Sequence, residues 1–322
     1  MHWQPDCTLE TAQRRAQLMQ LARLYFAEQR VLEVETPMLS GSAVSDVNID
    51  SLTVTSMLSR QPLYLHTSPE YAMKRLLAAG WPDIYQLTRV FRDGECGANH
   101  QPEFTMLEWY RHEADLQRIV DDTCKLIETL LDGTASARER ALAPRRQSTY
   151  DDALRLATGS DSDASLQALR ALCGDGFSAS LTDDRDAMLD FLFDTHAARS
   201  FSPDSLTVIT DYPASQAALA VIDTATNRAL RFEIYLGSLE LANGFVELRD
   251  AAEQRARFES DLERRETAGK QCPPLDEAFL SALSAGLPAC AGVAVGFDRL
   301  VMLADGSRSL SDVLSFAHQP TS

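Results

Sequence analysis

Apolar residues recur at helical spacing near the start of the chain. Between residues 9 and 29 they follow the i, i+3, i+4 pattern of an amphipathic helix, and Thr8 is suited to cap it. These positions are Ala12, Ala16, Met19, Ala22 and Phe26. A second helix is expected after Ser68, because Pro69 and Glu70 favour a helix start. Further helices are predicted at 115–132, 163–172, 184–199, 249–267 and 275–285.

Two segments alternate apolar and polar residues as strands do. Residues 84–92 and 103–111 are separated by ten residues that include Gly94 and Gly97. This pattern predicts two antiparallel strands joined by a long polar loop. Other predicted strands are 31–35, 49–55, 63–66, 206–211, 217–223, 229–242 and a glycine-spaced strand at 292–296. Neighbouring hairpins between helices predict an α+β architecture, an antiparallel sheet flanked by helices.

The length and the net charge of the chain limit its number of domains and its class of partner. A chain of 322 residues is enough for one large domain, which we expect over 1–322, with 134–200 as a candidate surface insertion. The net charge of −17 disfavours extended contact with tRNA or DNA, because such contacts need Lys and Arg to neutralise phosphates. The basic run "PRRQ" at 144–147 is too short to change this expectation.

Cysteine usage and the N-terminus indicate the compartment. The six cysteines are scattered without a CxxC pair, which is typical of free thiols in a reducing compartment. No apolar run approaches the roughly 20 residues of a membrane helix, and "MHWQPDCTLE" does not have the features of a signal peptide. We therefore expect a cytoplasmic protein that does not contact a membrane.

The segment "ELANGFVEL" contains Asn243-Gly244, a strong local signal for a hairpin turn. A two-residue turn there would place Glu240 opposite Glu247 on one face of the sheet. Like charges in that position repel, and a Mg²⁺ ion carried by a nucleotide would relieve the repulsion. The alternative is that both glutamates point to solvent, and the local pattern does not decide between the two.

The segment "GVAVGFDRL" predicts a strand followed directly by a helix whose first turn contains Arg299. A cation is disfavoured at the positive end of a helix, unless an anion such as phosphate binds there. The alternative is a tight strand–helix junction with a surface arginine.

The loop-flanking strands at 84–92 and 103–111 also contain candidate binding residues. Arg92 ends the first strand and would need an anionic partner if it were buried. Glu108 and Tyr110 lie two residues apart on one face of the second strand, where they could receive an ammonium group. The alternative is an exposed edge strand of mixed polarity.

Together these segments resemble the catalytic domain of class II aminoacyl-tRNA synthetases, most closely lysyl-tRNA synthetase. The match to the first motif ends at Pro37, the second motif matches "RVFRDGECGANHQPEFTMLEWYR", and the third matches "GVAVGFDRLVML". "TSPEYAMKRLLAAG" and "ELANGFVEL" resemble further lysine-type signatures, and the likeness spans about residues 8–317. The chain starts at the helix before the first motif, where lysyl-tRNA synthetases carry an OB-fold domain. Ala294 stands where the synthetases have the middle glycine of the third motif.

Both departures resemble the truncated lysyl-tRNA synthetase paralogues that modify translation elongation factor P. The resemblance implies that ATP activates lysine or (R)-β-lysine as an adenylate, and that a lysine side chain of elongation factor P receives the acyl group. It also implies a homodimer and no tRNA partner. The alternatives are a minimal lysyl-tRNA synthetase and a non-catalytic amino-acid sensor on the same fold.

The resemblance also implies roles for individual residues. Arg92 and Arg299 would be catalytic and hold the nucleotide's phosphates. The expected ATP-binding residues are Arg92, Asp93, Gly94, His100, Gln101, Phe104, Glu240, Leu241, Gly296 and Arg299. The expected substrate-binding residues are Ser68, Pro69, Glu70, Glu108, Tyr110, Glu247 and Ala294. Glu240 and Glu247 would also hold Mg²⁺. The pair Asp93-Gly94 departs from the Asn-Glu that is usual after the motif-two arginine, and Gln101 replaces an asparagine.

Overall fold

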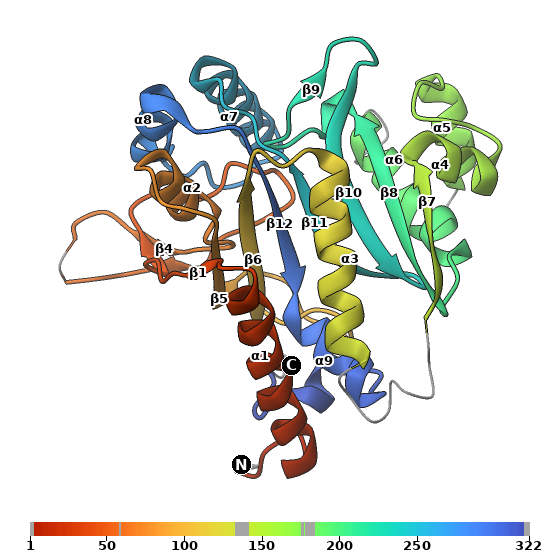
Figure 1. The fold of residues 1–322 in the computed structure, drawn as a ribbon. Coiled ribbons are helices and arrows are strands. Elements are labelled where there is room, and N and C mark those ends of the chain that lie inside the picture. Colours follow the sequence, from red (N-terminus) through yellow and green to blue (C-terminus); the bar gives the residue numbers. More distant parts are fainter. Residues whose placement is uncertain (1–2, 58, 133–141, 175–176, 178–183, 319–322) are drawn as a thin grey trace.

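A large, mostly antiparallel sheet forms the centre of the molecule (Figure 1). The computed structural model describes residues 3–318, apart from residues 58, 133–141, 175–176 and 178–183. The strand order is β1-β5-β6-β12-β11-β10-β8-β7, and β9 pairs with β10. Their bounds are β1 Leu32–Glu33, β5 Ile84–Phe91, β6 Glu103–His112, β7 Ala143–Thr149, β8 Ser205–Pro213, β9 Ile222–Asp223, β10 Arg228–Leu236, β11 Leu239–Val246 and β12 Cys290–Gly296.

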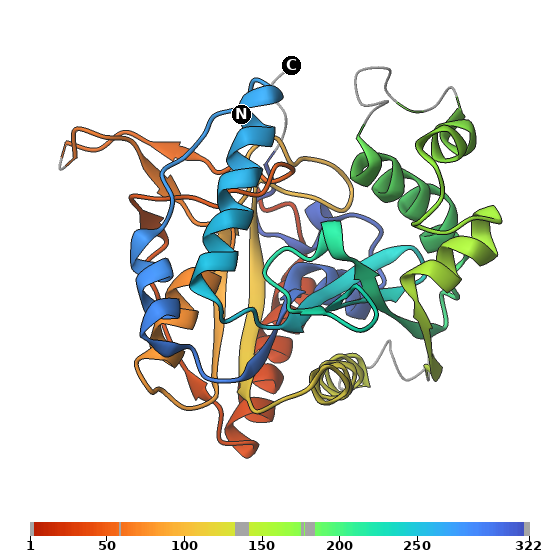
Figure 2. The same cartoon turned by 90° about the horizontal axis from the view of Figure 1, so that it is seen from above.

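Helices cover both faces of this sheet, as the view from above shows (Figure 2). They are α1 Leu9–Glu28, α2 Glu70–Ala78, α3 Leu116–Asp132, α4 Tyr150–Thr158, α5 Leu166–Cys173, α6 Arg185–Leu192, α7 Ala251–Thr267, α8 Glu277–Gly286 and α9 Phe297–Asp305. Helices α1, α3 and α9 share one apolar core with the sheet, and α2, α7 and α8 share another. The α+β prediction is therefore confirmed.

Helix α1 begins as predicted. The Thr8 hydroxyl accepts a hydrogen bond from the Thr11 backbone N–H at 3.1 Å. Its buried face differs from the predicted stripe, because Leu18 and Tyr25 are buried whereas Ala16 is exposed. The position of a helix start is decided locally, but its buried face depends on which neighbours pack against it.

Strand β12 lies between β6 and β11, at the middle of the sheet. Ala294 pairs with Glu108 of β6 on one side and with Asn243 of β11 on the other. Strand β12, which follows the other described strands in the sequence, therefore joins the two halves of the sheet.

The predicted turn at Asn243-Gly244 is wrong, because both residues lie inside β11. Adjacent backbone explains the glycine: a Cβ on Gly244 would lie 2.6 Å from the Gly292 carbonyl oxygen. The chain turns instead between Leu236 and Leu239, where Gly237 has a φ of 58°. Glu240 and Glu247 are therefore not cross-strand partners.

A small second sheet carries the strands predicted between 49 and 66. Its order is β2-β4-β3, with bounds β2 Leu39–Ser40, β3 Thr53–Val54 and β4 Leu63–Leu65. The predicted strand at 217–223 is wrong except for β9. A 3₁₀ turn at Ala214–Gln216 and the positive φ of 48° at Ala218 interrupt extended structure there.

The described part of 134–200 packs against the outer strands of the main sheet. Residues 143–149 form edge strand β7, parallel to β8, where the sequence had indicated a surface excursion. Leu154 of α4 and Leu189 of α6 share an apolar cluster with Ile209 and Tyr235 of the sheet. Residues 133–141 lie outside the described part, and the surface-insertion interpretation stays a prediction.

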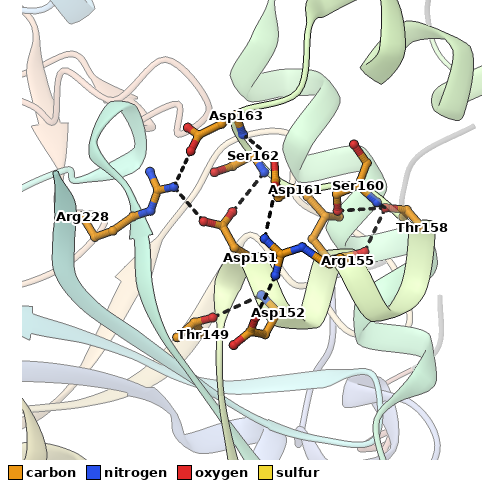
Figure 3. A network of polar contacts seen from close by, with 11 residues as sticks. Thr149, Asp151, Asp152, Arg155, Thr158, Ser160, Asp161, Ser162, Asp163 and Arg228 are labelled. Atoms are coloured by element: carbon orange, nitrogen blue, oxygen red, sulfur yellow. Dashed lines mark hydrogen bonds and ion pairs between the residues drawn. The ribbon is translucent and has the colours of Figure 1, made fainter. Parts of the chain in front are cut away.

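A polar network also fastens this region to the sheet (Figure 3). The Arg228 guanidinium, at the start of β10, donates to Asp151 at 2.7 Å and to Asp163 at 2.8 Å. Asp151 in turn accepts the Ser162 backbone N–H at 3.0 Å. Helix α4 and the loop after it are thereby held to one arginine of the sheet.

The described helices do not have membrane-spanning character. None of them combines the length and the apolar composition that a crossing requires.

Candidate functional site

A cavity of about 370 Å³ opens on the sheet face that carries α2 and α7. This size is in the range of roughly 300–1,000 Å³ that small-molecule sites occupy. Fourteen of the residues predicted from the sequence line it: Ser68, Glu70, Arg92, His100, Gln101, Phe104, Glu108, Tyr110, Glu240, Leu241, Glu247, Ala294, Gly296 and Arg299. Residues distant in the sequence therefore meet in one place.

Three predicted residues are not in the lining of this cavity. Pro69 occupies the N-cap position of α2. Asp93 and Gly94 line a separate cavity together with Asp50 and Lys270. Asp93 is held there through its backbone N–H, which donates to the Asp50 carbonyl at 2.8 Å. Their predicted contact with ATP stays a prediction.

One end of the cavity is a cluster of buried carboxylates. Glu108 is 2% exposed and accepts hydrogen bonds from Ser68 and from Tyr110, each at 2.7 Å. Burial and the negative charge of Glu70 raise the pKa of Glu108 to about 7. Ser68 also accepts the Glu70 backbone N–H at 3.0 Å, so one hydroxyl links the start of α2 to β6. The two hydroxyl groups fix the orientation of the Glu108 carboxylate.

Glu247 and Glu70 share a buried lysine. The Lys74 ammonium lies 2.6 Å from Glu70 Oε1 and also contacts Glu247 Oε2. Burial alone would lower the pKa of Lys74, but the charges of Glu247 and Glu70 outweigh it and raise this pKa above its usual value. Glu247 Oε1 is buried without a hydrogen-bond partner among the described residues. An unsatisfied buried carboxylate oxygen that lines a cavity is suited to accept from a bound cation.

The wall beside Glu247 is backbone at Gly292. A Cβ there would lie 2.4 Å from Tyr110 Cε1 and 2.6 Å from Glu247 Oε1. Glycine is therefore required for the Tyr110 ring and the Glu247 carboxylate to meet at this point.

The other end of the cavity holds arginines. The Arg92 guanidinium lies 5.1 Å from the centroid of the Phe104 ring, and its Nη1 is 3.7 Å from Glu95 Oε1. Arg92 Nε is buried and has no partner among the described residues. Arg92 therefore keeps a donor for an anion, next to an aromatic face on which a base could stack.

Arg299 lies in the first turn of α9, as predicted. It donates to the Glu240 carbonyl at 2.6 Å and lies 3.1 Å from His100 Nε2. Since a guanidinium only donates, the His100 nitrogen accepts, and burial and the charge of Arg299 lower the pKa of His100. The cationic end therefore contains a fixed arginine and a neutral imidazole.

The predicted Mg²⁺ ligands separate into two environments. Glu247 is paired with the Lys74 ammonium, and Glu233 is paired with the Arg231 guanidinium. Glu240 lines the same cavity as Glu233, and burial and then the charge of Glu233 raise the pKa of Glu240. Mg²⁺ in nucleotide sites commonly uses one or two carboxylates in addition to phosphate oxygens. Glu240 and Glu233 fit that donor set, although among the described residues no three or more acidic, histidine or cysteine side chains gather as a metal site.

Sequence reasoning missed Lys74, Glu233 and Arg231. Arg231 lines the cavity and donates to Asn243 at 3.2 Å and to Glu233 at 2.5 Å. Glu70 and Lys74, four residues apart in a predicted helix, were a signal for an ion pair. The contacts of Arg231 and Glu233 depend on the pairing of β10 with β11, which the incorrect turn concealed.

Comparisons with known proteins agree with this geometry. The family model described as class II tRNA synthetases (D, K and N) matches residues 3–320. An elongation factor P–(R)-β-lysine ligase of Haemophilus ducreyi is 42% identical over 324 residues, which cover 98% of this chain and 96% of that relative. The enzyme of the same name from Avibacterium paragallinarum is 40% identical over 326 residues, 98% of this chain and 97% of the relative. That of Salmonella paratyphi B is 42% identical over 319 residues, again 98% and 97%.

Proposed function

The chain belongs to the class II tRNA synthetase family (D, K and N), and we propose that it is an ATP-dependent ligase that joins (R)-β-lysine to a lysine side chain of elongation factor P. Relatives at 40–42% identity over nearly the whole chain are named as ligases of this kind. The geometry described above supports the same reaction.

One observation carries the proposal: the cavity has a carboxylate end and an arginine end. Glu108, Glu247 and Tyr110 suit the ammonium groups of a lysine isomer. Arg92 and Arg299 suit its carboxylate and the phosphates of ATP. An amino acid bound this way has its carboxylate directed toward the nucleotide.

The first step is adenylate formation. A substrate carboxylate oxygen attacks the α-phosphorus, a new O–P bond forms, and pyrophosphate leaves with the electrons of the bond that breaks. Arg92, whose Nε has no partner among the described residues, would stabilise the charge that develops on the phosphate. Catalysis in this step is mainly positioning and charge stabilisation.

The second step is transfer. The neutral amine of the acceptor lysine attacks the acyl carbon, an amide bond forms, and AMP leaves with the bonding electrons. The amine must first lose a proton, which passes to solvent or to a basic group.

Magnesium would be held by Glu240 and Glu233, which both line the cavity, and the expected contribution of Glu247 stays a prediction. When bound, it would neutralise charge on the phosphates of ATP. Arg299, which donates to the Glu240 carbonyl, would keep that strand end in place.

We expect a protein acceptor and not tRNA. The net charge of −17 opposes contact with a polyanion, and the partner named for the relatives is elongation factor P. Since that partner belongs to the translation machinery, we expect the protein to act in the cytoplasm.

Two assays test the proposal. ATP–pyrophosphate exchange is measured with (R)-β-lysine, α-lysine and no amino acid, and exchange is expected to be fastest with (R)-β-lysine. Transfer of the labelled amino acid is then compared between purified elongation factor P and bulk tRNA. If none of the lysine isomers supports pyrophosphate exchange, the protein is an amino-acid sensor. If only tRNA becomes labelled, it is a minimal lysyl-tRNA synthetase.

A further inference from the structure

Lys74 differs from the other cations near the cavity because it is enclosed. Its side chain is 1% exposed, and its ammonium lies 5.5 Å from the Phe245 ring centroid and 5.8 Å from that of Phe279. An ammonium in such surroundings is retained only when carboxylates compensate it. Its partners Glu70 and Glu247 both line the cavity.

The contacts of Lys74 use one oxygen of each partner. The ammonium lies against Glu70 Oε1 and Glu247 Oε2. Glu247 Oε1 and Glu70 Oε2 have no protein partner among the described residues. One lysine therefore orients two carboxylates and leaves one oxygen of each for a ligand.

The charges of this cluster are unbalanced. Glu108 lines the same cavity as Glu70 and Glu247, and Ser68 links it to the Glu70 backbone N–H. Among the described residues, the Glu108 oxygens accept from the hydroxyl groups of Ser68 and Tyr110. The cluster thus contains three carboxylates and one resident ammonium, which leaves a formal charge of −2 when all four groups are ionised. Two ammonium groups on a ligand would balance this charge.

We propose that Lys74 is a positioning residue of the amino-acid site, which holds Glu70 and Glu247 so that the cluster accepts a ligand with two ammonium groups. This inference rests on the proposed function, because it takes a diamino acid as the substrate. Lys74 acts through the two glutamates and does not touch the ligand. Its own charge prevents the carboxylates from repelling each other before the ligand arrives.

Two substitutions separate charge from packing. Methionine in Lys74→Met is close to lysine in shape and lacks the charge, whereas arginine in Lys74→Arg retains the charge and is bulkier. We expect KM for (R)-β-lysine in the exchange assay to rise roughly 30- to 100-fold in Lys74→Met, the usual scale for truncating one partner of a buried charged contact. KM for ATP should stay within about threefold of wild type, and Lys74→Arg should be less impaired than Lys74→Met. A role in packing alone predicts the reverse order.

The matched control is Lys125→Met, the same change at an exposed position of α3. It should leave both KM values unchanged. Thermal unfolding with and without (R)-β-lysine provides a reading on folded protein: the ligand should raise the melting temperature of wild type and fail to do so in Lys74→Met, while ATP still stabilises both.

Each outcome has one meaning. The role of Lys74 would be overturned if Lys74→Met kept a KM for (R)-β-lysine within about threefold of wild type. It would also be overturned if Lys74→Met were less impaired than Lys74→Arg. If Lys74→Met does not fold, Lys74→Arg decides: a KM for (R)-β-lysine within about tenfold of wild type supports the role, and a larger rise overturns it. If the wild-type protein does not exchange pyrophosphate with any lysine isomer, the proposed function itself is wrong.

Discussion

At Gly292 the amino-acid site depends on the absence of a side chain. Tyr110 and Glu247 both approach its Cα so closely that a Cβ would lie within 2.6 Å of each side chain. Contacts this short are repulsive, and both side chains belong to the predicted ammonium pocket.

We expect Gly292→Ala to reduce amino-acid activation at least about 100-fold, because the methyl group displaces Tyr110 or Glu247 from binding geometry. ATP binding should be nearly unchanged, since the arginine end of the cavity is separate. Exchange kinetics and nucleotide titration measure the two effects. Gly97→Ala, where a Cβ would meet no atom within 4 Å, is the control.

Glu108 gives the site a pH dependence. Its pKa is raised from 4.5 to about 7 by burial and by the charge of Glu70, so the folded protein keeps a proton that the unfolded chain releases. The stability that this proton contributes is fully present below about pH 4.5 and is lost as the pH rises through 7. The loss amounts to at most about 3 kcal/mol.

The variant Glu108→Gln stays neutral throughout this window. Relative to wild type, its free energy of unfolding should therefore rise by about 1–3 kcal/mol between pH 5 and pH 8. Urea unfolding at both values measures the difference, and the exposed Glu103→Gln should show none. If the free energies of unfolding of Glu108→Gln and wild type changed equally between pH 5 and pH 8, Glu108 would not be protonated in the folded state.

Several elements depend on one buried residue, Asp298 of α9. Its carboxylate accepts the Thr105 backbone N–H of β6 at 2.9 Å and lies 2.6 Å from the Arg15 guanidinium of α1. Three elements are joined there, directly before the cavity residue Arg299.

We expect Asp298→Asn to lower the free energy of unfolding by about 2–4 kcal/mol, because it leaves the Arg15 charge without its partner in a buried position. Displacement of α9 should also weaken ATP binding through Arg299. Asp305→Asn, which breaks the more exposed contact with Arg14, should cost less than about 1 kcal/mol. Equal losses in the two variants would contradict this account.

Local signals predicted most elements and failed where packing decides. Thr8 caps its helix as expected, and the two strands around the long loop are β5 and β6. Asn243-Gly244 had the composition of a turn, but its glycine is required by the close approach of β12 and the Phe232 ring. The same error hid Glu233 as the neighbour of Glu240, because that relation exists only after β10 and β11 pair.

At the scale of the whole molecule, apolar side chains remain exposed around the first motif. Leu24, Leu32, Met38 and Leu39 are 43–51% exposed and lie on α1, β1, β2 and the segment before β2. Exposed apolar side chains commonly mark an interface where they form one patch. They agree with the homodimer expected from the sequence.

In sedimentation equilibrium we expect a mass twice that of one chain. Leu32→Arg should shift the protein to the monomer, because it would bury a charge at the interface. Leu156→Arg, at an 87% exposed site on α4, should leave the mass unchanged. A wild-type monomer at micromolar concentration would exclude the dimer.

The position of β12 has a consequence for biosynthesis. The ribosome makes this strand after both of its neighbours, β6 and β11, and it inserts between them. Until then β6 and β11 are open edges that can pair with another nascent chain. The sheet cannot close, and the amino-acid site cannot exist, before the segment that contains β12 has been synthesised.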